Sequence, residues 1–100
     1  MPKYYLSKTA EDDLREIIEY TFAEWGIEQV FKFRDSLDSR LATLAKFPEV
    51  GRKNINLPEY IIYVVEGKHY VFYKVVDDGI EVIRFLHSKM DIFNHISKYL

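Results

Sequence analysis

The sequence predicts an α+β fold with the element order β-α-α-β-β-β, followed by a short terminal helix. Apolar residues recur with helical spacing over residues 10–46, and strand-like runs joined by short turns follow over residues 60–87. The chain has 100 residues, of which 48% are hydrophobic and 16% aromatic. This composition is typical of a folded protein, and we expect one domain over residues 1–100.

The chain is expected to begin with a strand followed by a helix. Tyr4–Lys8 is prone to β-structure. Thr9 is the expected N-cap of the helix, because the acidic Asp12 follows three residues later and resembles a capping box. Within Ala10–Trp25 the apolar residues follow the spacing of an amphipathic helix. We therefore expect this helix to bury one face.

A second helix is expected to follow directly. Gly26 is placed to end the first helix, and the apolar stripe resumes over Glu28–Lys46, before Pro48. A link this short predicts an αα-hairpin whose two stripes face the same core. Pro48–Pro58 is expected to be a loop, and it carries the adjacent basic residues Arg52 and Lys53.

Three strands are expected in the second half. They are Tyr60–Val65, His69–Val76 and Ile80–His87, joined by turns at Glu66–Lys68 and Asp77–Gly79. Short turns of this kind predict antiparallel pairing. We therefore expect the helical hairpin to pack on a small antiparallel sheet.

The middle strand is expected to be apolar on both faces. Its alternation places one set of side chains on each face: Val71, Tyr73 and Val75 on one, and Tyr70, Phe72 and Val76 on the other. The helical hairpin covers one face, and a bare second face of this kind is unfavourable. Asp91–Leu100 is expected to form a short helix that covers part of it.

Composition and charge exclude several classes of protein. The chain has no cysteine, so disulfides and thiolate zinc sites are excluded. Its net charge of −2 argues against a broad basic face for nucleic acid, and no sequence-specific nucleic-acid binding is expected. No signal peptide is recognisable, and the longest apolar run, Tyr60–Val65, is far shorter than a membrane span. A cytoplasmic protein is the expectation.

Several segments resemble the ParE toxins of the RelE/ParE superfamily. Ala10–Gly26 resembles the first helix of that family, which ends in Trp-Gly, and Pro48–Gly51 resembles its Pro-x-x-Gly element. Gly67–Tyr73 is similar to its third strand, and Ile80–Asp91 to its terminal His-x-x-Arg-Asp signature. The chain departs from that signature at Met90, where many members have arginine.

The resemblance implies the toxin of a type II toxin–antitoxin pair. Toxins of the ParE type poison DNA gyrase, block replication and are neutralised by a ParD-type antitoxin. RelE-like relatives on the same fold instead cut mRNA on the ribosome, and fold alone does not choose between them. A toxin that has lost its toxicity and still binds its antitoxin is a third hypothesis.

His87 is the first candidate site residue. It ends a predicted strand close to Lys89 and Asp91, and Asp91 is placed to orient its ring for acid–base chemistry. The structural alternative is a hydrogen bond between His87 and Asp91 that joins the last strand to the last helix. Arg84 and Lys74 are expected in a positive patch or, alternatively, as solvated strand residues; the other members of that patch would be Arg52, Lys53, Lys68 and Lys89.

Other candidates follow from the aromatic residues and the helical stripes. Tyr73 is a target-binding candidate or, alternatively, a core residue. The apolar groove of the helical hairpin is the expected dock of an antitoxin helix, although the same stripes fit a simple core. The antitoxin-binding candidates on these stripes are Leu14, Ile18, Phe22, Phe33, Leu37 and Leu41.

The sequence favours a protein without enzymatic activity. A nuclease on the ribosome needs clustered cations to stabilise charge on phosphate, and the chain is acidic overall. If it were a nuclease, the residues would be His87, Arg84, Lys89 and Tyr99. His69 and His95 stand alone in the sequence, so neither a metal site nor a cofactor is expected.

Overall fold

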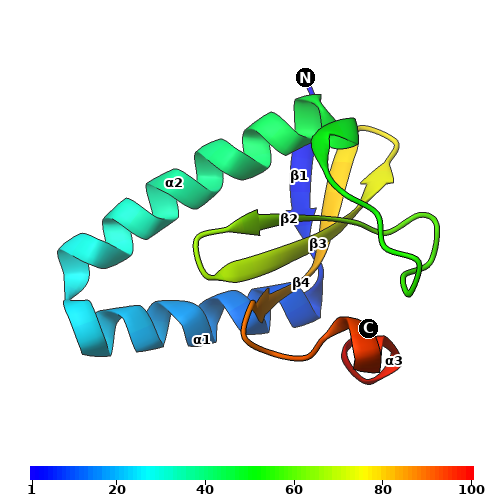
Figure 1. Ribbon diagram of the computed structural model, residues 1–100. Helices are drawn as coiled ribbons and strands as arrows, with labels where there is room; N and C mark the ends of the chain where they lie inside the picture. Colours follow the sequence, from blue (N-terminus) through cyan, green and yellow to red (C-terminus); the bar gives the residue numbers. More distant parts are fainter.

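A computed structural model describes residues 1–100 of the chain. Its elements are, in order, β1 (Lys3–Leu6), α1 (Lys8–Trp25), α2 (Ile27–Lys46), β2 (Ile62–Glu66), β3 (His69–Val76), β4 (Gly79–His87) and α3 (Ile96–Tyr99) (Figure 1). The predicted element order is confirmed. The terminal helix is shorter than predicted, because a 3₁₀ turn over Phe93–His95 precedes α3. No helix is long and apolar enough to cross a membrane.

The strands form one mixed sheet in the order β1-β4-β3-β2. The β2–β3 and β3–β4 pairs are antiparallel as predicted, whereas β1 runs parallel to β4. The predicted antiparallel sheet of the second half is therefore extended by one parallel strand, β1, whose direction the sequence did not predict. Its pairing covers only the segment 79–82 of β4, so the segment 83–87 of β4 has no neighbouring strand on that side. This open stretch of β4 borders the candidate site.

Ser7, and not Thr9, is the N-cap of α1. The Ser7 hydroxyl accepts a hydrogen bond from the Ala10 N–H at 3.0 Å and donates one to the Ile83 carbonyl at 2.8 Å. The Ser7 N–H also donates to the Val82 carbonyl at 2.9 Å. The prediction of Thr9 was wrong because Ser7 lies where β1 leaves the sheet, so one residue can cap the helix and bond β4.

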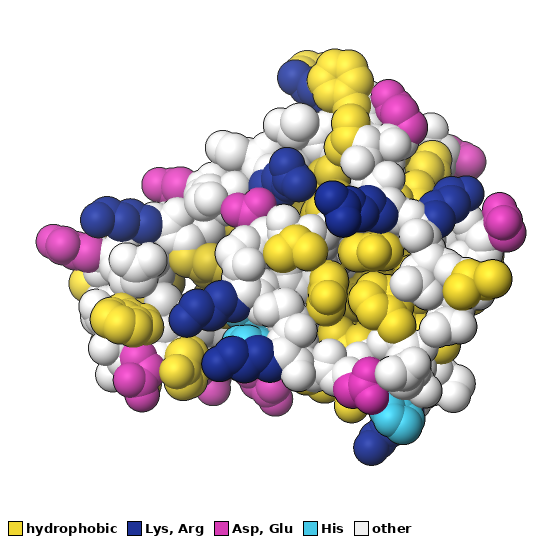
Figure 2. Space-filling model, viewed as in Figure 1, with side chains coloured by type: hydrophobic (Ala, Val, Ile, Leu, Met, Phe, Trp, Pro, Cys, Tyr) yellow, Lys and Arg dark blue, Asp and Glu magenta, His cyan; other side chains and the backbone are white.

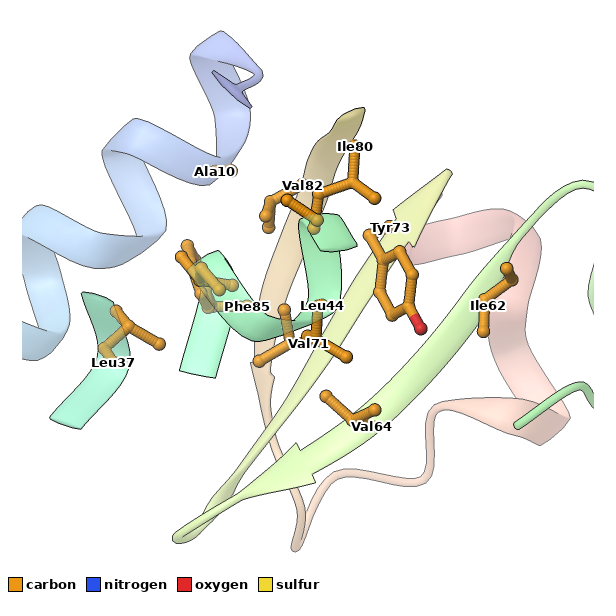
Figure 3. Close-up of a cluster of buried hydrophobic side chains, with 12 residues drawn as sticks. Ala10, Leu37, Leu44, Ile62, Val64, Val71, Tyr73, Ile80, Val82 and Phe85 are labelled. Atoms are coloured by element: carbon orange, nitrogen blue, oxygen red, sulfur yellow. The ribbon is translucent and has the colours of Figure 1, made fainter. Parts of the chain in front are cut away.

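The helices cover one face of the sheet and build the main core (Figure 3). Leu37, Leu41 and Leu44 of α2 pack against Val71 of β3 and Val82 of β4 in this core. Their exposed fractions are 5% or less, so the α2 stripe is confirmed as buried. Burying one leucine side chain stabilises a fold by about 1.5–3 kcal/mol, which makes this layer a main source of stability.

The second face of the sheet is covered by the long loop and the C-terminal segment. Leu57, Ile61 and Ile92 pack there against Phe72 and Leu86. The expectation that the terminal segment covers this face is confirmed. The ring of Phe93 lies 5.1 Å from that of Tyr63, 5.4 Å from that of Tyr70 and 6.1 Å from that of Phe72, between centroids. These contacts hold the terminal segment on the sheet.

Candidate functional site

A cleft of about 1120 Å³ lies between the helical hairpin and the free ends of β3 and β4. In Figure 1 the turn between β2 and β3 points into the opening between α1 and α2. Residues Tyr20, Trp25 and Phe33 line the helical side, and His69 and His87 line the strand side. The cleft brings His69, Arg84, His87 and Lys89 into one lining.

The helical wall of the cleft exposes large aromatic residues. Tyr20 is 66% exposed and Trp25 is 71% exposed, although both belong to a helix with a buried face. Ile17 and Phe33 lie deeper in the same wall and pack partly against the core. Exposed aromatic residues grouped in a cleft are typical of a surface that a protein partner covers.

The strand wall of the cleft carries two adjacent histidines. His69 of β3 lies directly opposite His87 of β4, and their rings are 5.3 Å apart in an edge-to-face arrangement. Burial and the neighbouring His87 lower the pKa of His69 below its usual value, which favours the neutral ring. His87 Nδ1 accepts the Lys89 N–H at 3.1 Å, so the neutral ring of His87 carries its proton on Nε2.

Lysines flank this histidine pair. Lys68 precedes His69 in the β2–β3 turn, and Lys89 follows His87 after β4. The Ser88 N–H donates to the Lys68 carbonyl at 2.8 Å and thereby ties the two segments together. Figure 2 shows Lys or Arg side chains beside a histidine over the β2–β3 turn and the end of β4. Neither lysine is in an ion pair.

Arg84 is engaged within the fold. Its Nε and Nη2 donate to the two carboxylate oxygens of Asp13 at 3.0 and 2.8 Å, and its Nη1 donates to the Tyr99 carbonyl at 2.9 Å. The hydrogen bonds to Asp13 raise the pKa of Arg84 above its usual value. The structure therefore does not place Arg84 in a positive patch with Lys89, and Tyr99 contributes a backbone carbonyl to this contact.

Asp91 does not orient His87. Its carboxylate accepts a hydrogen bond from the Asn94 amide at 2.9 Å and lies 3.6 Å from His95 Nε2. Both expected forms of a His87–Asp91 contact are therefore wrong, because Asp91 faces the turn that follows it. His69 and His95 do not stand alone either, since the fold supplies a partner for each.

Tyr73 and Lys74 also lie outside the cleft. Tyr73 is completely buried, and its hydroxyl donates to the Pro48 carbonyl at 2.7 Å, so it cannot touch a target. The alternative interpretation of Tyr73 as a core residue is the correct one. Lys74 Nζ lies 3.5 Å from Glu81 on the adjacent strand, in a partly exposed ion pair.

The antitoxin-binding candidates fall into different environments. Leu37 and Leu41 are buried in the core, which excludes direct contact with a partner in this fold. Leu14 and Ile18 are half-buried, and Leu14 packs against the core. Of the six candidates only Phe33 lines the cleft, whereas Phe22 is exposed outside it.

Sequence reasoning missed Asp13 and the pairing of His69. Nothing in the sequence links Asp13 to Arg84, which is 71 residues away. The hairpin turn places His69 near the end of β4, which was a usable signal. No group of three or more metal-ligating side chains is brought together anywhere in the structure.

Comparison with solved structures identifies the fold. The structure superposes on a chain described as "Chromosomal ParDE TA system from P. aeruginosa" with a TM-score of 0.72. The match covers 89% of this chain and 98% of the other at 14% sequence identity, which shows the fold.

Sequence comparison identifies the family. The profile of "ParE toxin of type II toxin-antitoxin system, parDE" matches residues 4–92. The chain is 33% identical to "Toxin ParE1" of Caulobacter vibrioides over 96% of this chain and 99% of the relative. It is 32% identical to "Toxin ParE1" of Mycobacterium tuberculosis over 90% and 93%, and 32% identical to "Toxin ParE" of Escherichia coli over 100% and 98%. The chain belongs to the ParE toxin family of type II toxin–antitoxin systems.

Proposed function

We propose that this protein is a cytoplasmic toxin that binds and poisons DNA gyrase and is neutralised by a ParD-like antitoxin. It acts by binding alone and uses no cofactor. Membership of the ParE family supports the toxin role, and the P. aeruginosa neighbour is described as a ParDE system. Residues 1–100 act as one domain in this proposal.

The engagement of Arg84 is the observation that favours a binding protein over a nuclease. The nuclease hypothesis assigns Arg84 the stabilisation of charge on a transferring phosphate. The guanidinium of Arg84, the strand arginine nearest His87, instead donates its hydrogen bonds to Asp13 and to the Tyr99 carbonyl. His87 has no carboxylate partner, and its Nδ1 is occupied by a backbone N–H. The four residues of the nuclease hypothesis therefore do not form one catalytic group.

The exposed aromatic wall supports the antitoxin part of the proposal. Tyr20 and Trp25 present apolar surface that an amphipathic segment of a ParD-like antitoxin would bury. Leu37 and Leu41 are buried in the core and are not part of this wall.

A supercoiling assay tests the proposal. Purified DNA gyrase, relaxed plasmid and the isolated protein are incubated, and the gel is read for both supercoiling and trapped cleaved DNA. We expect inhibition with cleaved DNA, and reversal when the antitoxin is added. If gyrase is unaffected and ribosome-bound mRNA is cut instead, the RelE-like alternative is correct. No effect in either assay would leave an antitoxin-binding protein without toxicity.

A further inference from the structure

The cleft lining carries an excess of positive charge when the residues already held in ion pairs are left out of the count. The acidic residues of the lining are Asp13, Glu16 and Glu66, and its Lys and Arg residues are Lys32, Lys68, Arg84 and Lys89. Asp13 is paired with Arg84, and Glu66 is paired with Arg40 from outside the lining, at 3.5 Å. Three lysines and one glutamate therefore remain without an ion pair. The cleft is cationic although the chain as a whole carries a net charge of −2.

This excess positive charge is concentrated at the ends of the strands. Lys68 and Lys89 both lie just beyond the His69–His87 pair, at the same end of the β3–β4 ladder, and the hydrogen bond from the Ser88 N–H to the Lys68 carbonyl fixes the two segments relative to each other. The Nε2–H of neutral His87 is a further donor. All four residues line the same cleft. Ammonium groups and imidazole N–H groups are donors suited to an oxyanion.

We propose that Lys68, His69, His87 and Lys89 bind a phosphate of the DNA backbone while the toxin is docked on gyrase. This inference rests on the proposed function and deepens it, because gyrase holds DNA when it is poisoned. Two lysines neutralise only a few phosphates, so the contact is independent of sequence and too weak to recruit naked DNA strongly. The toxin accordingly recognises gyrase with DNA bound in preference to free gyrase.

A matched pair of double variants tests the site. Lys68→Ala/Lys89→Ala removes two exposed lysines of the site, and neither is in an ion pair of the fold. Lys3→Ala/Lys46→Ala removes the same total charge from exposed positions outside the cleft. Both proteins should melt close to wild type, so differences in binding report on the site and not on folding.

The first measurement is direct binding of the isolated chain. We titrate it at low salt with a short DNA duplex and follow the imidazole ring protons of His69 and His87 by NMR. Both rings should shift with the duplex, and Lys68→Ala/Lys89→Ala should weaken the affinity about tenfold and lower the salt slope by about 2, as expected for two lost phosphate contacts. The Lys3→Ala/Lys46→Ala control should keep the wild-type slope.

The second measurement compares toxin binding to gyrase with and without DNA. Wild type should bind the DNA-bound enzyme more tightly, and Lys68→Ala/Lys89→Ala should lose that preference while still binding free gyrase. If wild type does not bind gyrase, the proposed function fails and the duplex titration still decides the phosphate site. Unshifted histidines, equal affinities of both double variants, or a response to single-stranded RNA or inorganic phosphate but not to duplex DNA would overturn the inference.

Discussion

At the scale of single residues, one carboxylate joins three parts of the molecule. Asp13 of α1 accepts two hydrogen bonds from Arg84 and a third from the Phe85 N–H at 3.1 Å. The third bond satisfies a backbone donor on the stretch of β4 that β1 leaves uncovered. Arg84 in turn holds the Tyr99 carbonyl of the C-terminal segment. The pair is mostly buried, with side-chain exposures of 22% and 12%.

Asp13→Ala should therefore be strongly destabilising. The substitution leaves a largely buried guanidinium and a backbone N–H without their acceptor, and removing one partner of such a contact costs about 2–4 kcal/mol. The free energy of unfolding, measured by urea denaturation, should fall by that amount. Asp12→Ala is the control, because Asp12 pairs only with exposed Lys8 and Arg15. Equal losses for the two variants would contradict the structural role of Asp13.

At the scale of elements, the Pro48–Gly51 turn is explained by its contact with β3. The buried Tyr73 hydroxyl donates to the Pro48 carbonyl, which connects the loop after α2 to the sheet. Gly51 has an ordinary negative φ, so its backbone does not require glycine. A Cβ at this position would collide with the Tyr73 hydroxyl and with a methyl group of Ile62. Glycine is therefore required at position 51 because a Cβ atom does not fit there, and not because of its backbone conformation.

Gly51→Ala should cost about 1–3 kcal/mol of stability, the usual range for overpacking a core. Thermal or urea unfolding of the single variant gives this number. A double-mutant cycle with Tyr73→Phe identifies the cause, because loss of the hydroxyl relieves part of the collision. The cost of Gly51→Ala should be smaller in the Tyr73→Phe background by at least about 0.5 kcal/mol. Strict additivity would show that the collision lies elsewhere.

Two elements show where prediction from the sequence reached its limit. The order of helices and strands followed from periodicity and turn residues, which are local signals. The position of His69 opposite His87 did not follow from such signals, because the β3–β4 register changes at a bulge between Phe72 and Tyr73. The turn pairs Val76 with Gly79, and continuing that register would place His69 opposite Leu86. One extra residue in β4 therefore places His69 opposite His87, and no sequence pattern marked that extra residue.

At the scale of the whole molecule, the apolar residues lie in three places, which are the two faces of the sheet and the cleft. The helices cover one face, and the long loop and C-terminal segment cover the other (Figure 1). The cleft remains open. Of the helix-stripe residues that the sequence offered for antitoxin binding, Leu37 and Leu41 proved to be core. Stripe membership alone could not separate buried Leu37 from exposed Phe22, since both fit a helical period.

The single tryptophan provides a direct test of which apolar surface the antitoxin covers. Trp25 lines the cleft and is 71% exposed, so burial by an antitoxin helix should shift its fluorescence emission to shorter wavelength. In calorimetry, Trp25→Ala should weaken antitoxin binding roughly 30-fold, as expected for an aromatic anchor worth about 2 kcal/mol. Phe22→Ala, a change at an exposed aromatic outside the cleft, should have much less effect.

The same binding should stabilise the toxin as a whole. A ligand that binds only the folded state adds about 2.7 kcal/mol at a free concentration of 100 times its Kd, so the melting temperature of wild type should rise with antitoxin concentration. Trp25→Ala should need a correspondingly higher antitoxin concentration for the same rise, whereas Phe22→Ala should follow the wild-type curve. A stronger effect of Phe22→Ala in both measurements would move the antitoxin from the cleft to the surface around Phe22, because Trp25 lines the cleft and Phe22 does not.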